Sequence, residues 1–241
     1  PVCVGQSIVF SGSYTGKVET TPTYFWSIVS PSGTTTTYTT QNVTISNPIV
    51  GTYLPTLKVT TIRNDYTYTN SKTTSITVLP NASLALTSAP ATTNQTICIN
   101  SPLPNIPYTA AGTSTVTLTG LPAGVTGNYS GNVATISGTP TVEGTFNYTV
   151  TASGSCLPAS QSGTFKVNQS YWVGTESNEW NTVANWTCGI PTTGADVVFA
   201  AITNSYGSMA LRDLHLENTK TIGSLINASD RNLIIKPRAA L

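Results

Sequence analysis

The stretch from Gly131 to Cys156, GNVATISGTPTVEGTFNYTVTASGSC, decides the predicted fold of this chain. In its first half, Val133, Thr135 and Ser137 alternate with Ala134 and Ile136. In its second half, Phe146, Tyr148 and Val150 alternate with the polar residues Thr145, Asn147 and Thr149. A period of two is typical of β-strands that bury one face. Because Gly138-Thr-Pro-Thr interrupts the pattern, the stretch predicts two strands joined as a hairpin that ends at a cysteine.

The composition favours an all-β protein whose solvent-facing surfaces are neutral. Charged residues make up 8% of the 241 residues, and hydrophobic residues make up 39%. An ordinary soluble domain has about 25% charged residues. Here threonine, a β-branched and polar residue suited to exposed strand faces, takes much of their place.

The charge pattern argues against a nucleic-acid partner, and the lengths of the apolar runs argue against a membrane span. The net charge is +1 and no basic run occurs, so the positive stripe that a nucleic-acid partner requires is missing. No apolar run reaches the roughly 18 residues that suggest a membrane span. The sequence starts without a methionine and stops within a repeating pattern, which suggests a segment of a longer exported protein.

The chain divides into three predicted units, residues 1–79, 80–169 and 170–241. The first two contain short alternating segments separated by turns about every ten residues, as in an immunoglobulin-like sandwich. The third contains short hydrophobic segments between polar turns, which suggest the start of a β-solenoid or another repetitive β-sheet, truncated at Leu241. These segments are 211–216, 222–226 and 233–235.

Three groups of motifs resemble known bacterial repeats. CVGQSIVFSGS, YFWSIVSPSG and VGTYLPTLKVT in the first unit resemble the PKD and immunoglobulin-like repeats of Bacteroidota surface proteins. GLPAGV, ISGTPT and GTFNYTVTA in the second unit resemble immunoglobulin modules of the same proteins. The aromatic start of the third unit is similar to segments that precede β-helical regions of bacterial surface proteins. Ser30-Pro-Ser-Gly33 replaces the acidic turn of well-known PKD domains, so their calcium role does not carry over.

This resemblance implies sandwiches that act as spacers or adhesion units. It also implies a cell-surface location, export by the type IX route, and a role in attachment or gliding. The expected partners are surface glycans or extracellular polysaccharide, together with the export and anchoring machinery of the parent protein.

Four cysteines allow three pairings. Cys98 and Cys156 flank the second unit and are predicted to pair, which by loop entropy would stabilise it by about 4 kcal/mol. Cys3 and Cys188 have no evident partner within the chain. Since no CxxC or Cys/His zinc spacing occurs, the cysteines indicate an oxidising, extracellular compartment rather than a metal site.

The densest aromatic group consists of Trp172, Trp180 and Trp186, with Tyr171 beside them. Two interpretations stay open. The rings could form a platform on which sugars stack, or they could form a hydrophobic cap on the first coil of the solenoid.

The acidic residues give weak candidate sites. Asp213, His215 and Glu217 would share one face of a strand, which fits a metal site but also an ordinary solvated face. Glu176 and Glu179 could be a glycosidase pair, although both lie in a predicted loop.

The second unit has little chemistry for catalysis. Between residues 80 and 169 the only acid is Glu143 and the only base is Lys166. General acid–base catalysis requires positioned groups that this unit lacks, and no common catalytic motif occurs in the chain.

The sequence therefore predicts a non-catalytic segment of a large exported adhesin, without metal or cofactor, that serves as a stalk or spacer. The alternative is a carbohydrate-binding accessory region of a secreted enzyme that degrades polysaccharides. Trp26 is predicted to be the core tryptophan of the first sandwich.

Overall fold

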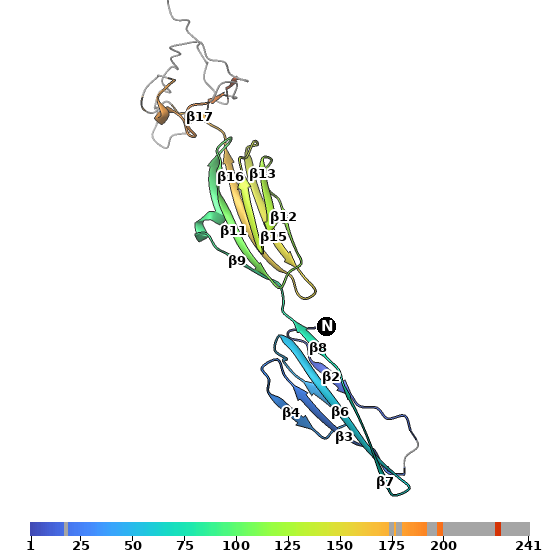
Figure 1. The fold of residues 1–241 in the computed structure, drawn as a ribbon. Helices are drawn as coiled ribbons and strands as arrows, with labels where there is room; N and C mark the ends of the chain where they lie inside the picture. The colour runs from blue at the N-terminus through green and yellow to red at the C-terminus, as the bar shows by residue number, and fades with distance from the viewer. Residues whose placement is uncertain (17–18, 174–175, 177–179, 192–196, 200–224, 228–241) are drawn as a thin grey trace, which may run out of the picture.

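The computed structural model describes residues 1–16, 19–173, 176, 180–191, 197–199 and 225–227. Within these residues, β-strands make up the regular structure apart from two short 3-10 helices, Pro90–Thr93 (η1) and Val183–Asn185 (η2). The all-β prediction is therefore confirmed. Two β-sandwiches lie end to end, and a smaller parallel sheet follows them in the chain (Figure 1).

The first sandwich packs a large sheet against a small one. The large sheet has the order β1-β8-β6-β3-β4, with β7 also paired to β6, and the small sheet pairs β2 with β5. The strands are β1 (Val2–Cys3), β2 (Ile8–Ser11), β3 (Thr23–Val29), β4 (Thr35–Tyr38), β5 (Asn42–Ile45), β6 (Gly51–Arg63), β7 (Tyr66–Thr73) and β8 (Ile76–Leu79). Trp26 lies in the core between them, 5.7 Å from Phe10 between ring centroids. The predicted core tryptophan is confirmed.

The second sandwich has two four-stranded sheets, β13-β14-β11-β9 and β10-β16-β15-β12. The strands are β9 (Ser83–Leu86), β10 (Asn94–Cys98), β11 (Leu103–Ala111), β12 (Thr115–Thr119), β13 (Val125–Ser130), β14 (Val133–Gly138), β15 (Gly144–Ser153) and β16 (Ala159–Asn168). One sheet has the A-B-E-D order of an immunoglobulin domain and the other its C-F-G order, with β10 added parallel to β16. This topology makes the sandwich immunoglobulin-like.

Alternating residues of both sheets fill the core of the second sandwich. Phe165 stacks on Tyr148 with ring centroids 4.8 Å apart, and both side chains are fully buried. The Tyr148 hydroxyl forms a buried hydrogen bond of 3.2 Å with the hydroxyl of Tyr108. Since both side chains are buried, this bond gives each hydroxyl a partner, one as donor and the other as acceptor.

The Gly131–Cys156 stretch contains the two expected strands, but they do not form a hairpin. Strand β14 pairs with β11 and β13, whereas β15 pairs with β12 and β16 in the opposite sheet. The predicted hairpin is therefore wrong, because the interrupting segment crosses from one sheet to the other. Thr139 and Thr141 fix this crossing by donating backbone hydrogen bonds to Gly124 and Ala123.

The third sheet is small and parallel. Strand β17 (Tyr171–Trp172) pairs with β18 (Val197–Phe199), which pairs with β19 (Leu225–Asn227). Most of the solenoid segments predicted from the sequence lie outside the described residues.

Candidate functional site: the junctions at the two ends of the second sandwich

Two disulfide bonds join parts of the fold that are far apart in the sequence. Cys3 pairs with Cys156 and Cys98 pairs with Cys188, with Cα atoms 5.6 and 5.5 Å apart. Each bond connects the second sandwich to a neighbouring unit, the first to the sandwich before it and the second to the segment after it. Both cysteines that had no evident partner in the sequence are therefore paired within the chain.

The predicted Cys98–Cys156 bond does not form, for a geometric reason. Cys98 ends β10 beside Asn168, the last residue of β16, whereas Cys156 precedes the start of β16. The ten residues of β16 therefore separate the two cysteines, a length of about 33 Å at 3.3 Å per residue. A disulfide requires Cα atoms within about 7 Å of each other. The two cysteines flank the sandwich in sequence but lie at its opposite ends in space.

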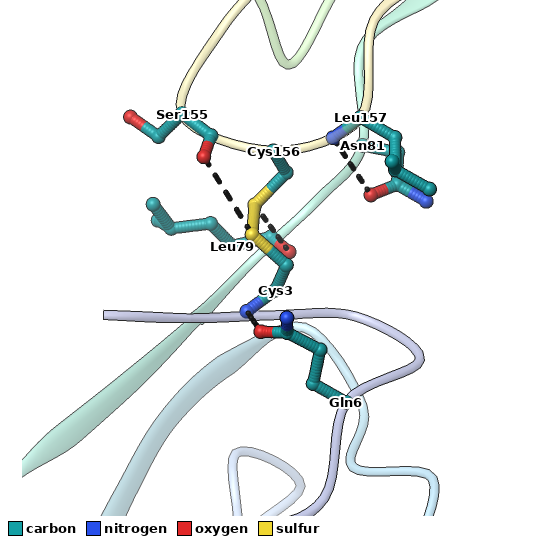
Figure 2. The surroundings of a disulfide bond; sticks show 7 residues. All are labelled: Cys3, Gln6, Leu79, Asn81, Ser155, Cys156 and Leu157. Atoms are coloured by element: carbon teal, nitrogen blue, oxygen red, sulfur yellow. Dashed lines mark hydrogen bonds between the residues drawn. A yellow bond between two sulfur atoms is a disulfide. The ribbon is translucent and has the colours of Figure 1, made fainter.

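Figure 2 shows the junction between the two sandwiches, which combines the disulfide with backbone contacts. Cys3 is paired with Leu79 in the parallel β1–β8 ladder, directly before the three-residue linker 80–82. The linker contacts the turn that carries Cys156, because the Ala82 amide donates to the Leu157 carbonyl at 2.9 Å. The Leu157 amide also lies 3.4 Å from Oδ1 of Asn81 (Figure 2).

The apolar side chains at this junction differ in exposure, since Ala82 of the linker is buried. Leu157, the junction's largest apolar side chain from the second sandwich, is 66% exposed. The Leu157 side chain therefore adds little hydrophobic contact here, and the disulfide adds a covalent restraint beside the linker.

The junction at the other end of the second sandwich pairs Cys98 with Cys188. The Ser170 hydroxyl donates to the Gly189 carbonyl at 2.6 Å, which closes the segment back on itself. The Tyr171 hydroxyl donates to the Glu143 carboxylate at 3.3 Å, a contact with the second sandwich. Partial burial and then the Glu143 charge raise the pKa of the Tyr171 hydroxyl, so it stays protonated and able to donate.

The three tryptophans meet in a compact cluster. Trp172 and Trp180 each pack edge-on against Trp186, with ring centroids 5.0 and 4.7 Å away. The Trp186 indole N–H donates to the Trp180 carbonyl at 2.9 Å. The side chains are 1%, 4% and 5% exposed in sequence order, so no ring face is open in the way that a sugar-stacking platform requires. This packing has the form of the hydrophobic cap.

The acidic candidates are not assembled into a site in the described part of the chain. Glu176 is exposed, and its backbone amide donates to Oδ1 of Asn185 at 3.0 Å. Glu179, Asp213, His215 and Glu217 lie outside the described residues. No group of three or more His, Cys, Asp or Glu side chains that could hold a metal occurs among the residues that the structure describes.

Within the same residues, no helix is long and apolar enough to span a membrane.

Sequence comparison gives one informative relative. A segment of 77 residues is 43% identical to the minor fimbrium subunit Mfa5 of Porphyromonas gingivalis, a member of the Bacteroidota. The match covers 30% of this chain and 6% of that protein, so the chain corresponds to a small part of its relative. No family model matches the chain. The match agrees with the resemblance to Bacteroidota surface proteins, and the comparisons give no support for PKD membership or type IX export.

Solved structures with similar coordinates belong to immunoglobulin-domain proteins. An I-band fragment of titin has a TM-score of 0.46 at 11% identity, covering 82% of this chain and 66% of that chain. Immunoglobulin domains 1–4 of Sidekick-1 have a TM-score of 0.48 at 12% identity, covering 69% of this chain and 46% of that chain. At these values the fold assignment rests on the strand order described above.

Proposed function

We propose that this chain is a non-catalytic stalk segment of an exported cell-surface protein. In this proposal residues 1–79 and 80–169 are rigid spacers and residues 170–241 begin a repetitive β-region. The disulfide pattern carries the proposal, because each bond fixes a neighbouring unit to one end of the second sandwich. A second covalent connection beside a three-residue linker restrains bending at the point where tandem domains normally hinge.

The extracellular location rests on the same bonds. Disulfides persist in oxidising compartments and are rare in the cytosol. The relative is named as a subunit of a fimbrium, which fits this location. We extend the proposal from the sequence resemblance in two ways. The parent protein is exported by the type IX route, and it serves in attachment or gliding.

The third unit is proposed to be the first part of a β-solenoid. Its strands are parallel, and Tyr171, Val198 and Ile226 are adjacent residues in the ladder. Neighbouring strands are thus offset by nearly equal lengths of chain, about 27 residues, which is typical of stacked solenoid coils. The tryptophan cluster would then cover the first coil.

Small-angle X-ray scattering of the oxidised chain and a Cys3→Ser/Cys156→Ser variant tests the stalk. We expect a single extended shape for the oxidised chain and a broader distribution of dimensions for the variant. A matched Cys98→Ser/Cys188→Ser variant should leave the distance between the two sandwiches unchanged. Equal flexibility of the oxidised chain and the first variant would contradict the proposal.

Glycan binding is the alternative derived from the sequence, and it requires a separate test. A glycan array should give no signal with the chain if the tryptophans act only as a cap. Specific binding that is lost in a folded Trp172→Ala/Trp180→Ala/Trp186→Ala variant would instead favour a carbohydrate-binding accessory region.

A further inference from the structure

The two disulfide bonds divide the covalent chain into parallel branches. Cys3 is bonded to Cys156 and Cys98 to Cys188, so each branch has one end at the first bond and the other end at the second. The branches are residues 4–97, 99–155 and 157–187. The first branch contains the first sandwich from β2 to β8, and the third contains β16.

The branches differ greatly in the length that they can reach. At roughly 3.5 Å per residue, branch 157–187 extends to at most about 110 Å, branch 99–155 to about 200 Å and branch 4–97 to about 330 Å. Because all three share their ends, the shortest branch becomes taut while the other two are still slack. The first sandwich lies in the longest branch, so its backbone bears no tension while both bonds are closed.

The first part of the shortest branch is already straight. Strand β16 has ten residues, which span about 33 Å at 3.3 Å per residue. It is held on both sides, by nine residue pairs with β15 and five with β10. Its side chains Phe165 and Val167 are buried in the core of the second sandwich. Tension that enters at Cys156 therefore meets a strand that is anchored and cannot lengthen.

At the far end of β16, tension can pass directly to the second disulfide. Cys98 is the ladder partner of Asn168, the last residue of β16, and the Ile99 amide donates to the Asn168 carbonyl at 2.8 Å. The Cys188 sulfur lies 3.7 Å from the same carbonyl oxygen. The parallel β10–β16 ladder thus connects Cys156 to Cys188 through extended backbone, and its hydrogen bonds are loaded together along the strands.

The rest of the shortest branch is stored length. Asn168 and Cys188 are 20 positions apart in the sequence, so the backbone between them can extend to about 70 Å. Their Cα atoms lie within roughly 11 Å of each other, because Cys98 is 5.5 Å from Cys188 and neighbouring strands are about 4.8 Å apart. The segment 169–187, which carries the three tryptophans, therefore stores about 60 Å of backbone.

We propose that the two disulfides route tension past the first sandwich, which becomes a load-free module of the stalk. Tension runs from Cys3 through Cys156 and β16 to Cys188. When the β10–β16 ladder yields, segment 169–187 unravels and absorbs about 60 Å of extension, and the first sandwich still bears no load. A partner bound to that sandwich is therefore not displaced when the stalk is pulled. This inference rests on the proposed stalk function, since the route matters only in a chain under tension.

Magnetic tweezers with handles before Pro1 and after Leu241 test the route on the full oxidised chain. Residues beyond Cys188 contribute the same length to every variant. The oxidised chain should show no unfolding step of the first sandwich. Cys3→Ser/Cys156→Ser places that sandwich under load and should add a step of about 260 Å, the length of the backbone from position 3 to Leu79.

The matched control removes the other disulfide. Cys98→Ser/Cys188→Ser keeps the Cys3–Cys156 bond, so the step of about 260 Å should stay absent. Its extension of about 60 Å should occur at lower force than in the oxidised chain, because the β10–β16 ladder no longer carries tension to position 188.

A second attachment point shows that the first sandwich can unfold at the forces used. A handle at Asp65, in the turn between β6 and β7, replaces the handle before Pro1 in the oxidised chain. Tension then enters the first sandwich itself. The force is raised until the sandwich opens, with a step of up to about 210 Å, the length of the backbone from Asp65 to Cys3.

Two results would overturn the inference. One is a step of about 260 Å in the oxidised chain at that force. The other is extension of Cys98→Ser/Cys188→Ser at the same force as the oxidised chain, which would show that the ladder carries no tension. Scattering without load keeps the two proposals apart. A single extended shape together with the step would refute the route alone, and a broad distribution of shapes without the step would refute the stalk alone.

Discussion

Reducing the two disulfides should greatly increase the length that this chain reaches under tension. With both bonds closed, the shortest covalent route from Cys3 to Cys188 crosses the Cys3–Cys156 bond and then follows the backbone to residue 188. This route contains about 32 residues and, at roughly 3.5 Å per residue, cannot exceed about 110 Å. With both bonds reduced the route contains about 185 residues and reaches about 650 Å.

Single-molecule force spectroscopy measures this difference directly. With handles attached before Pro1 and after Leu241, the residues beyond Cys188 contribute the same length in both states. The contour length should therefore increase by about 540 Å when reductant is added to the oxidised chain. A Cys3→Ser/Cys156→Ser variant keeps the second bond and leaves a route of about 95 residues, so its limit between positions 3 and 188 should be about 330 Å.

The same measurement separates the possible pairings. A lone Cys98–Cys156 bond, as the sequence predicted, would leave a route of about 127 residues and a limit of about 440 Å. Pairing of Cys3 with Cys98 and of Cys156 with Cys188 would give about 200 Å. An oxidised chain that extends well beyond 110 Å between Cys3 and Cys188 would refute the covalent arrangement and, with it, the basis of the stalk.

Three other perturbations test the interior of the fold. The Cys3–Cys156 bond closes a loop with a sequence separation of 153 residues, so Cys3→Ser/Cys156→Ser should lower stability by about 5 kcal/mol. Unchanged hydrogen exchange of the β15–β16 amides would contradict this. Burial and then the Tyr108 hydroxyl raise the pKa of Tyr148, so the folded state keeps a proton that the unfolded state loses near pH 10. Stability should therefore fall above pH 10, by up to about 1.4 kcal/mol per pH unit, and fall less in Tyr148→Phe, as urea unfolding at several pH values would show. Gly138→Ala should lower stability by about 1–3 kcal/mol in calorimetry, because Gly138 has a φ of 132° and an added Cβ would clash with the Gly124 carbonyl. Gly131→Ala, at a φ of 57° in open space, is the milder control.

Strands with one buried face could be predicted from the sequence because alternation records burial directly. Gly144–Ser153 has buried residues at every second position from Tyr148 to Ala152, and the alternation of Thr145 to Val150 is the pattern that predicted this strand. Strand β7 was not predicted. Its sequence, YTYTNSKT, alternates between tyrosine and threonine only over its first four residues, and all eight residues are exposed, so no buried face marks the strand.

Connections between strands could not be predicted from local periodicity. The segment between Gly138 and Gly144 has turn residues that suit a hairpin, yet it crosses between sheets. The reason lies in distant backbone groups, since the Gly124 carbonyl accepts the Thr139 amide and the Pro140 carbonyl accepts the Asn100 amide. Such contacts depend on the packed fold and leave no signal within the segment itself.

The tryptophan cluster could be located from the sequence but not assigned. Aromatic density is compatible with both a sugar platform and a hydrophobic cap, because both use the same residues. The difference lies in exposure, which depends on whether Trp172 and Trp180 pack against Trp186 or lie apart.

The pairing of the cysteines also could not be predicted from the sequence, and the structure suggests why the junctions carry covalent bonds. A Cys98–Cys156 bond would have stabilised a sandwich that already has a core of fully buried residues such as Ile106, Tyr148 and Phe165. The junction with the first sandwich has no such core, because Leu157 is largely exposed and few backbone hydrogen bonds cross it. A disulfide there restrains a motion that weak noncovalent contacts would permit. The position of each cysteine near the end of a unit was the available signal in the sequence, and it fits bonds between units as well as a bond that closes one unit.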